Sequence, residues 1–208
     1  GNMVQANSIS IALTNAFNIP SWVIGIVLAA VVAVVVIGGQ RRITALAELL
    51  VPFMAIVYIL GSLIIIYMFA DQLPHVLRTI FTDAFSLKSA AGGAAGTVMK
   101  YAIRYGVARG LFSNEAGMGS TPHAHALADV KDPCEQGFVA MAGVFVDTVL
   151  ICTSTAFVIM LTGAYDHTGL KSVAITQQGF EIAFGEGGII FLAISLIFFA
   201  FTTIIGWY

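Results

Sequence analysis

The sequence predicts an all-α membrane protein built as a multi-span helix bundle. Of its residues 59% are hydrophobic and only 10% are charged, whereas about a quarter of the residues in a soluble domain are charged. Its mean hydropathy is +0.95. Asp, Glu, Lys, Arg and His are absent from long windows, each about as long as or longer than the roughly 20 residues that span a bilayer as a helix. These windows are 1–40, 49–70, 148–165 and 187–208.

The first two predicted helices differ in polarity. Residues 4–17 carry polar side chains at helical spacing, and we expect these side chains to face a bundle interior rather than lipid. They are Gln5, Asn7, Ser8, Ser10, Thr14 and Asn15. Residues 21–38 are rich in Val, Ile and Ala and are expected to face lipid. Pro20 lies between the two segments and is expected to mark the start of the second helix, because proline can begin a helix but cannot continue one.

The third helix is predicted at residues 43–70. Pro52 should kink it, since a proline inside a helix removes one backbone hydrogen bond and clashes with the preceding turn. Arg41 and Arg42 form the densest basic cluster near a helix end. Because basic residues are enriched in cytoplasmic loops, this turn is predicted to lie on the cytoplasmic side.

The rest of the chain predicts further helices separated by polar connections. The helices are expected at 95–117 (broken), 137–163 and 180–208, so that residues 1–208 form a single transmembrane transporter fragment. With the orientation above, the connection 118–136 is cytoplasmic, and the loops 71–95 and 164–179 face outward. The first of these loops should include a short amphipathic helix.

The predicted break lies in residues 106–122, where glycines and small polar side chains follow a helix-like segment. Lipid tolerates irregular backbone only where protein or a water-filled cavity surrounds it. An interrupted helix exposes N–H and C=O groups that bind a carboxylate and a cation respectively. The segment therefore favours a transporter site near the bilayer midplane. The alternative is that the chain from Gly117 onward is only the exit loop of an unbroken helix.

Asp147 is the second candidate, because an ionisable group inside a membrane segment is costly and is normally functional or paired. It belongs to one polar stripe together with Thr148, Cys152, Ser154 and Thr155. The alternative is a salt bridge between Asp147 and Arg104 or Arg109 that only fixes packing.

Thr202, Thr203 and Trp207 are the third candidate. Thr203 and Trp207 are four residues apart and so share a helix face. Adjacent hydroxyl oxygens suit a hard cation such as sodium. The alternative is that both hydroxyls bond back to their own helix, as threonines in membrane helices often do.

Other function classes receive less support. The net charge is −2 without a basic stripe, so no nucleic-acid partner is expected. No Gly-x-Ser-x-Gly or His-Glu-x-x-His motif is present, and Cys134 and Cys152 are expected to be free thiols. An intramembrane enzyme with a metal at His123, His125 and Asp129 is the rival hypothesis. A purely structural subunit would have no reason to carry a polar stripe and a broken helix.

Several motifs resemble the alanine/glycine:cation symporter family, the sodium:alanine symporters of bacteria and archaea. The central one is the stretch 109–120, RGLFSNEAGMGS. The other matching stretches are 1–8 (GNMVQANS), 136–137 (QG), 143–148 (GVFVDT), 151–153 (ICT), 155–157 (TAF) and 201–208 (FTTIIGWY). The resemblance extends over nearly the whole chain.

This resemblance implies part of a LeuT-type inverted-repeat fold with a discontinuous helix near 106–120. It implies sodium-coupled symport of a small neutral amino acid, alanine or glycine, with Na⁺ as the coupling ion and no other cofactor. The location implied is the plasma or inner membrane of a prokaryote, with several passes through the lipid bilayer. The rival within the same superfold is coupling to protons through Asp147 or Glu115, or transport of another small solute.

The resemblance also carries site residues onto this chain. Substrate contacts fall on Gln5, Phe112, Ser113, Asn114, Gly117, Thr203 and Trp207. Cation contacts fall on Thr202 and Thr203, with Asp147 added by analogy to other LeuT-type transporters. The family's glycine-rich second helix and its last two helices are absent from this sequence. We therefore expect these N- and C-terminal helices of a parent chain to be necessary partners for transport.

Overall fold

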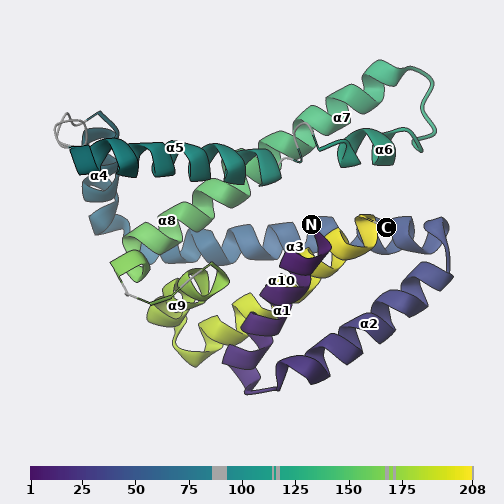
Figure 1. Cartoon of the computed structure of the whole chain (residues 1–208), viewed down its shortest axis with the longest axis horizontal. Helices are drawn as coiled ribbons and strands as arrows, with labels where there is room; N and C mark the ends of the chain where they lie inside the picture. Colours follow the sequence, from purple (N-terminus) through teal and green to yellow (C-terminus); the bar gives the residue numbers. More distant parts are fainter. Residues whose placement is uncertain (86–92, 114, 116–117, 167–168, 171, 208) are drawn as a thin grey trace. The chain divides into compact units, whose positions relative to one another are not determined.

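The computed structural model describes residues 1–208 except 86–92, 114, 116–117, 167–168, 171 and 208, and it describes only the backbone at 40, 83–85 and 93–99. Every element among the described residues is helical, and none of them is a strand (Figure 1). The chain divides into two compact units. The first unit is 1–69 with 154–208, and the second unit is 70–153. The prediction of an all-helical chain is confirmed.

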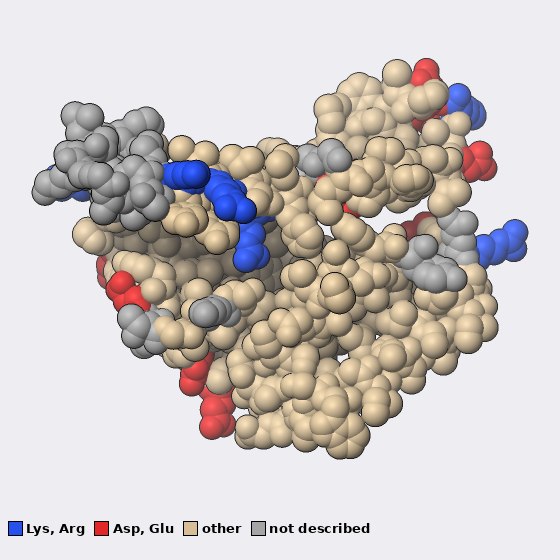
Figure 2. Space-filling model, viewed as in Figure 1, with Lys and Arg blue, Asp and Glu red and all other residues tan. Residues whose placement is uncertain are grey.

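Helices long and apolar enough to cross a membrane occur in the described part of the chain. They are Arg41–Met68, Pro133–Leu161 and Glu186–Gly206, and Ser21–Ile37 is a shorter apolar helix. Charged side chains are sparse on the face that Figure 2 shows. Helix length and composition therefore support a membrane protein, while the LeuT-type arrangement stays a prediction.

The N-terminal helices of the first unit are α1 (Asn2–Phe17), α2 (Ser21–Ile37) and α3 (Gln40–Met68). Asn18 ends α1 in the left-handed conformation, with its N–H donating to the carbonyl of Thr14 at 2.9 Å. Pro20 then occupies the N-cap of α2. Pro52 lies inside α3, as the sequence indicates. The predicted ranges 4–17, 21–38 and 43–70 overlap these helices.

The C-terminal part of the first unit differs from the prediction. After α8 (Thr153–Leu161) and a short 3₁₀ turn, α9 covers Val173–Phe184 and α10 covers Glu186–Gly206. The predicted loop 164–179 therefore contains the start of a helix, and the predicted helix 180–208 is interrupted at Gly185, whose φ is +64°. A Cβ on Gly188 would lie 2.0 Å from the carbonyl oxygen of Phe180, so glycine is required where the chain reverses.

The core of the first unit forms around α10, which contacts α1, α2, α3 and α9. Two clusters of buried apolar side chains hold these helices together. They are Ile9, Ile24, Ala200 and Ile204, and Val35, Phe201 and Ile205. Phe180 of α9 is completely buried, stacks on Phe191 with ring centroids 5.5 Å apart, and lies 5.9 Å from the ring of Tyr58. Burial of this apolar surface stabilises the unit.

The second unit begins with a 3₁₀ turn and α4 (Leu73–Phe85), which confirms the short amphipathic helix expected within 71–95. Then follow α5 (Gly93–Ser113), α6 (Ser120–His125) and α7 (Pro133–Phe145). Residues Val146–Cys152 form a π-helix, η3, which leads into α8. The predicted helix 137–163 is therefore real but contains a π-helical segment that the sequence analysis did not anticipate.

Candidate functional site

A turn separates α5 from α6, while a break inside a membrane-spanning helix stays a prediction. The helix α5 ends at Ser113, and α6 begins at Ser120 after Gly119, which has a φ of +84°. Glu115, between them, has a φ of +52°. Asn114 and Gly117, two predicted substrate contacts, lie outside the described residues. The helix α5 is not among the candidate membrane spans found in the described residues, and it carries Lys100, Arg104 and Arg109.

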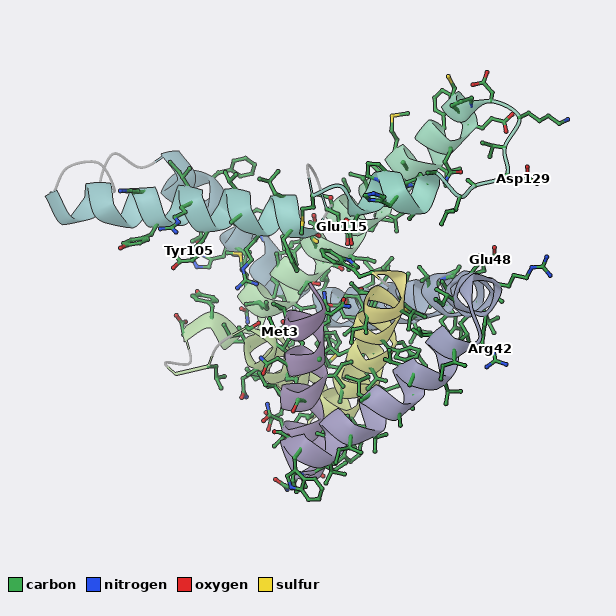
Figure 3. All side chains as sticks on the ribbon, turned by 45° about the vertical axis from the view of Figure 1, so that its right-hand side comes forward. Met3, Arg42, Glu48, Tyr105, Glu115 and Asp129 are labelled. Carbon is green, nitrogen blue, oxygen red and sulfur yellow. The ribbon has the colours of Figure 1, made fainter. Side chains whose placement is uncertain are left out.

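Glu115 closes the turn that leads into α6. Its carbonyl oxygen accepts from the N–H of Met118 at 3.1 Å. Its carboxylate accepts from the hydroxyl of Ser120 at 2.5 Å and from that of Thr121 at 3.4 Å. Figure 3 labels Glu115 at this position. The carboxylate therefore fixes the first turn of α6, a role that the sequence analysis did not assign to it.

Ser113, the last residue of α5, binds Asp147 of η3. The hydroxyl of Ser113 donates to Oδ2 of Asp147 at 2.5 Å, and it lies 3.4 Å from Sγ of Cys152. Hydrogen bonds from a hydroxyl to an ionised carboxylate are short and about twice as strong as neutral ones. Within the described part of the chain Asp147 pairs with neither Arg104 nor Arg109, so the salt-bridge alternative is wrong.

The π-helix explains why Asp147 and Cys152 meet the same hydroxyl. In an α-helix, residues five apart point in directions about 140° apart. In a π-helix the backbone hydrogen bonds join residues i and i+5. Two residues five apart, such as Asp147 and Cys152, therefore lie close together. Thr153 and Thr148 show the same relation, with the hydroxyl of Thr153 donating to the carbonyl of Thr148 at 3.2 Å. The spacing of these polar pairs is the one sequence signal that could have indicated the π-helix.

Gln5, Thr203 and Trp207 lie at one end of the packed α1–α10 pair. A Cβ on Gly1 would lie 2.7 Å from the indole ring of Trp207, so this ring covers the start of α1. Gln5 follows one turn further along α1, and Thr203 precedes Trp207 by one turn of α10. All three side chains are half-buried. Figure 1 marks the two chain ends at the corresponding ends of these helices.

The hydroxyls of Thr202 and Thr203 bond back to their own helix, the alternative that the sequence left open. Thr202 donates to the carbonyl of Phe198 at 2.9 Å, and Thr203 donates to that of Phe199 at 2.9 Å. Thr202 is buried and Thr203 is half-buried. A hydroxyl that donates in this way still keeps lone pairs on its oxygen, so both oxygens remain able to accept.

The metal hypothesis at His123, His125 and Asp129 gains no support. The described residues contain no group of three His, Cys, Asp or Glu side chains that could hold a metal ion. Nδ1 of His123 lies 2.6 Å from the carbonyl oxygen of Gly119. Nδ1 of His125 lies 2.5 Å from the side-chain nitrogen of Gln136. These contacts connect α6 to its surroundings within the second unit.

The sequence matches known proteins along its whole length. The sequence model of the sodium:alanine symporter family covers residues 1–208. The sodium/alanine symporter AgcS of Methanococcus maripaludis is 40% identical over 210 residues, covering 100% of this chain and 45% of that protein. An uncharacterized transporter of Haemophilus influenzae is 46% identical over 207 residues, covering 100% of this chain and 43% of that protein.

A further relative is the amino-acid carrier protein AlsT of Bacillus subtilis, 40% identical over 207 residues, which are 100% of this chain and 43% of that protein. The chain thus spans less than half the length of these relatives. The family and these relatives are transporters rather than enzymes. The family match covers every residue from 1 to 208, including the turn after Ser113, the Asp147 helix and the Thr202–Trp207 segment. The chain therefore belongs to the sodium:alanine symporter family.

Proposed function

We propose that the protein to which this chain belongs carries a small neutral amino acid, alanine or glycine, into a prokaryotic cell together with Na⁺. The observation that supports this proposal most strongly is the family match over residues 1–208. The chain contributes part of one site in a multi-pass membrane protein with a LeuT-type fold. The remaining N- and C-terminal helices complete the site, and alternating access moves it between the two sides of the membrane.

The cation is proposed to use oxygen ligands from two places in the chain. One is the Ser113–Asp147 pair, where a hydroxyl and a carboxylate oxygen lie 2.5 Å apart beside the helix break. The other is Thr202 and Thr203, whose oxygens keep acceptor capacity. Sodium is a hard cation and prefers such ligands. The negative charge of Asp147 offsets the positive charge of the ion.

The amino acid is proposed to contact residues on both sides of the helix break and at the α1–α10 end. Backbone N–H groups exposed by the break attract the substrate carboxylate. The side chains of Gln5 and Thr203 offer hydrogen bonds, and the rings of Phe112 and Trp207 limit the size of the substrate side chain. Ser113, Asn114 and Gly117 belong to the same proposed substrate contacts.

Uptake by the full-length protein in proteoliposomes tests this function. Radiolabelled alanine uptake should require a sodium gradient at fixed pH and should fail with potassium in place of sodium. Asp147→Asn should raise the sodium concentration for half-maximal uptake by at least about tenfold, because a hydrogen bond to a charged group contributes roughly 1.5–3 kcal/mol. Asp129→Asn is the matched control, since Asp129 is an exposed acid outside the proposed site. Uptake that is indifferent to sodium would refute the proposal.

Proton coupling is the second candidate, and the two carboxylates beside the break favour it. Asp147 accepts from Ser113, and Glu115 accepts from Ser120 and Thr121, so protonation of either would alter the hydrogen bonds at the break. Under this mechanism an inward proton gradient would drive alanine uptake in the absence of sodium. Glu115→Gln and Asp147→Asn would then show which carboxylate carries the proton.

A further inference from the structure

A polar pocket of about 460 Å³ lies in the first unit, between the C-terminal end of α1 and the helix α9. These two helices contact each other directly and are seen in Figure 1 in purple and yellow-green. The polar side chains that line the pocket are Thr14, Asn15, Asn18, Gln177, Gln178 and Glu181. None of them belongs to the proposed transport site. Gln5 lies ten residues before Asn15, a distance of about 15 Å along α1.

Gln177 holds the pocket in a defined shape. It is only 3% exposed, and its amide nitrogen donates to the carbonyl of Ala12 at 3.1 Å. Its amide oxygen accepts from the amide nitrogen of Asn15 at 2.9 Å. One of the two N–H groups of Asn15 is thereby occupied, whereas its side-chain oxygen has no partner among the described residues and is free to accept. A buried glutamine with both amide groups bonded in this way joins α9 to α1.

The lining favours a ligand that donates hydrogen bonds and carries positive charge. Glu181 is the one charged side chain that the described residues contribute to the pocket. Carboxylate oxygens only accept, and the oxygen of Asn15 accepts as well. An ammonium group has three donors and a positive charge, which match this arrangement. The amides of Asn18 and Gln178 can also donate, and could therefore bind a carboxylate at the other end of the ligand.

We propose that this pocket is a second amino-acid site, in which Glu181 and Asn15 bind the ammonium group of the ligand. Its volume falls in the range of about 300–1,000 Å³ that is usual for small-molecule pockets. The choice of an amino acid over another small amine rests on the proposed function. The site is distinct from the Gln5, Thr203 and Trp207 end of the same helix pair, so one molecule can occupy it while the transport site is empty.

Alkylation of an introduced cysteine tests the proposal in the full-length protein. Ala174→Cys places a thiol in the pocket lining without removing a proposed ligand group, in a background where Cys134, Cys152 and any other cysteines are replaced. Alanine in sodium-free buffer should slow the reaction of this thiol with a maleimide several-fold. Lactate, which has a hydroxyl in place of the ammonium group, should leave the rate unchanged. Methylammonium distinguishes a general amine site from an amino-acid site. At the same concentration as alanine, it should protect the thiol only if the pocket binds amines in general.

Three substitutions show where the protection arises. Glu181→Gln should abolish protection by alanine, whereas Glu186→Gln, a glutamate at the start of α10 outside the pocket, should keep it. Gln178→Leu, which replaces an amide by an apolar side chain in the same lining, should also abolish protection. Protection that persists in Glu181→Gln would overturn the proposal, as would equal protection by lactate.

A variant of the transport site separates this proposal from the proposed function. Trp207→Ala should lose alanine uptake, but alanine should still protect the thiol introduced by Ala174→Cys, because Trp207 is not part of the pocket. If the full-length protein took up no alanine yet alanine still protected the thiol, the proposed function would fail and the second site would stand. If the protein took up alanine but alanine gave no protection of the thiol, the second site would be refuted and the proposed function would stand.

Discussion

The two units place their polar groups in different kinds of surroundings. In the first unit, buried apolar side chains such as Ile9, Phe180 and Ile205 form a core. In the second unit, Val76 is the one buried apolar side chain among the described residues, and the exposed hydroxyl of Ser113 donates to Asp147. The first arrangement stabilises a core, whereas the second places a hydroxyl and a carboxylate where a ligand can reach them.

The largest effect is expected from Gly188→Ala in the first unit. The added Cβ would lie 2.0 Å from the carbonyl oxygen of Phe180, which is backbone and cannot move aside easily. Overpacking of this kind costs about 1–3 kcal/mol, so the melting temperature of the full-length protein in detergent should fall by several degrees. Gly187→Ala is the matched control, because a Cβ there meets nothing within 4 Å. Equal stability of the two variants would show that α9 and α10 are not packed as described.

Ser113→Ala should affect sodium dependence more than stability. It removes the hydroxyl that donates to Asp147, and a hydrogen bond to a charged group is worth roughly 1.5–3 kcal/mol. The sodium concentration for half-maximal uptake should rise about tenfold or more. Ser195→Ala is the control, since the hydroxyl of Ser195 donates to the carbonyl of Phe191 within its own helix. If both variants kept the wild-type sodium dependence, the Ser113–Asp147 hydrogen bond would have no role in sodium binding.

Thr202→Val and Thr203→Val test whether own-helix bonding excludes a role in cation binding. Valine keeps the shape of threonine but has no oxygen, so each variant removes one acceptor together with a bond to Phe198 or Phe199. If these oxygens bind sodium, the sodium requirement of uptake should increase measurably. Retention of the wild-type value would assign the cation to the Ser113–Asp147 pair alone.

The smallest effect concerns Asp132, the N-cap of α7 in the second unit. Its pKa is lowered from 3.8, chiefly by the hydrogen bond that its carboxylate accepts from the N–H of Cys134. A carboxyl with a depressed folded-state pKa contributes stability above its unfolded pKa and loses it as the pH falls through the folded value. Stability should therefore decrease slightly below pH 3.8.

Asp132→Asn should remove this pH dependence but keep the cap, because Asn also caps helices well. Asp129→Asn, which changes an acid without a capping hydrogen bond, should leave the dependence in place. The measurement is the melting temperature of the full-length protein between about pH 5 and about pH 3.

Much of the helical architecture follows from the sequence because apolar windows and turn residues act locally. Pro20 begins α2, as the sequence predicts, and α5 ends at Ser113 where the glycine-rich segment begins. The reversal at Gly185 was missed, because the sequence analysis assigned 164–179 to a loop and 180–208 to a single helix. The positive φ of Gly185 and the approach of Gly188 to the backbone of Phe180 show that the chain folds back there.

The candidate site was predicted in its residues more than in its geometry. Asp147 was expected to stand in an α-helical stripe, with Arg104 or Arg109 as its alternative partner, and the π-helix instead gives it the hydroxyl of Ser113. A π-helical turn depends on the balance of hydrogen bonds across the whole helix, so residue propensities did not indicate it. The role of Gln177 was missed for a similar reason, since its partners Ala12 and Asn15 are distant in sequence.

The sequence by itself determined that the chain is helical, that it is apolar enough to enter a membrane, and which family it belongs to. These properties depend on composition, local hydrogen bonding and residue order. Tertiary structure alone decided which polar groups meet: Ser113 with Asp147, and Asn15 with Gln177. The physical reason is that a hydrogen bond between side chains requires two distant segments to be positioned within about 3 Å, and helix packing rather than local sequence sets that distance.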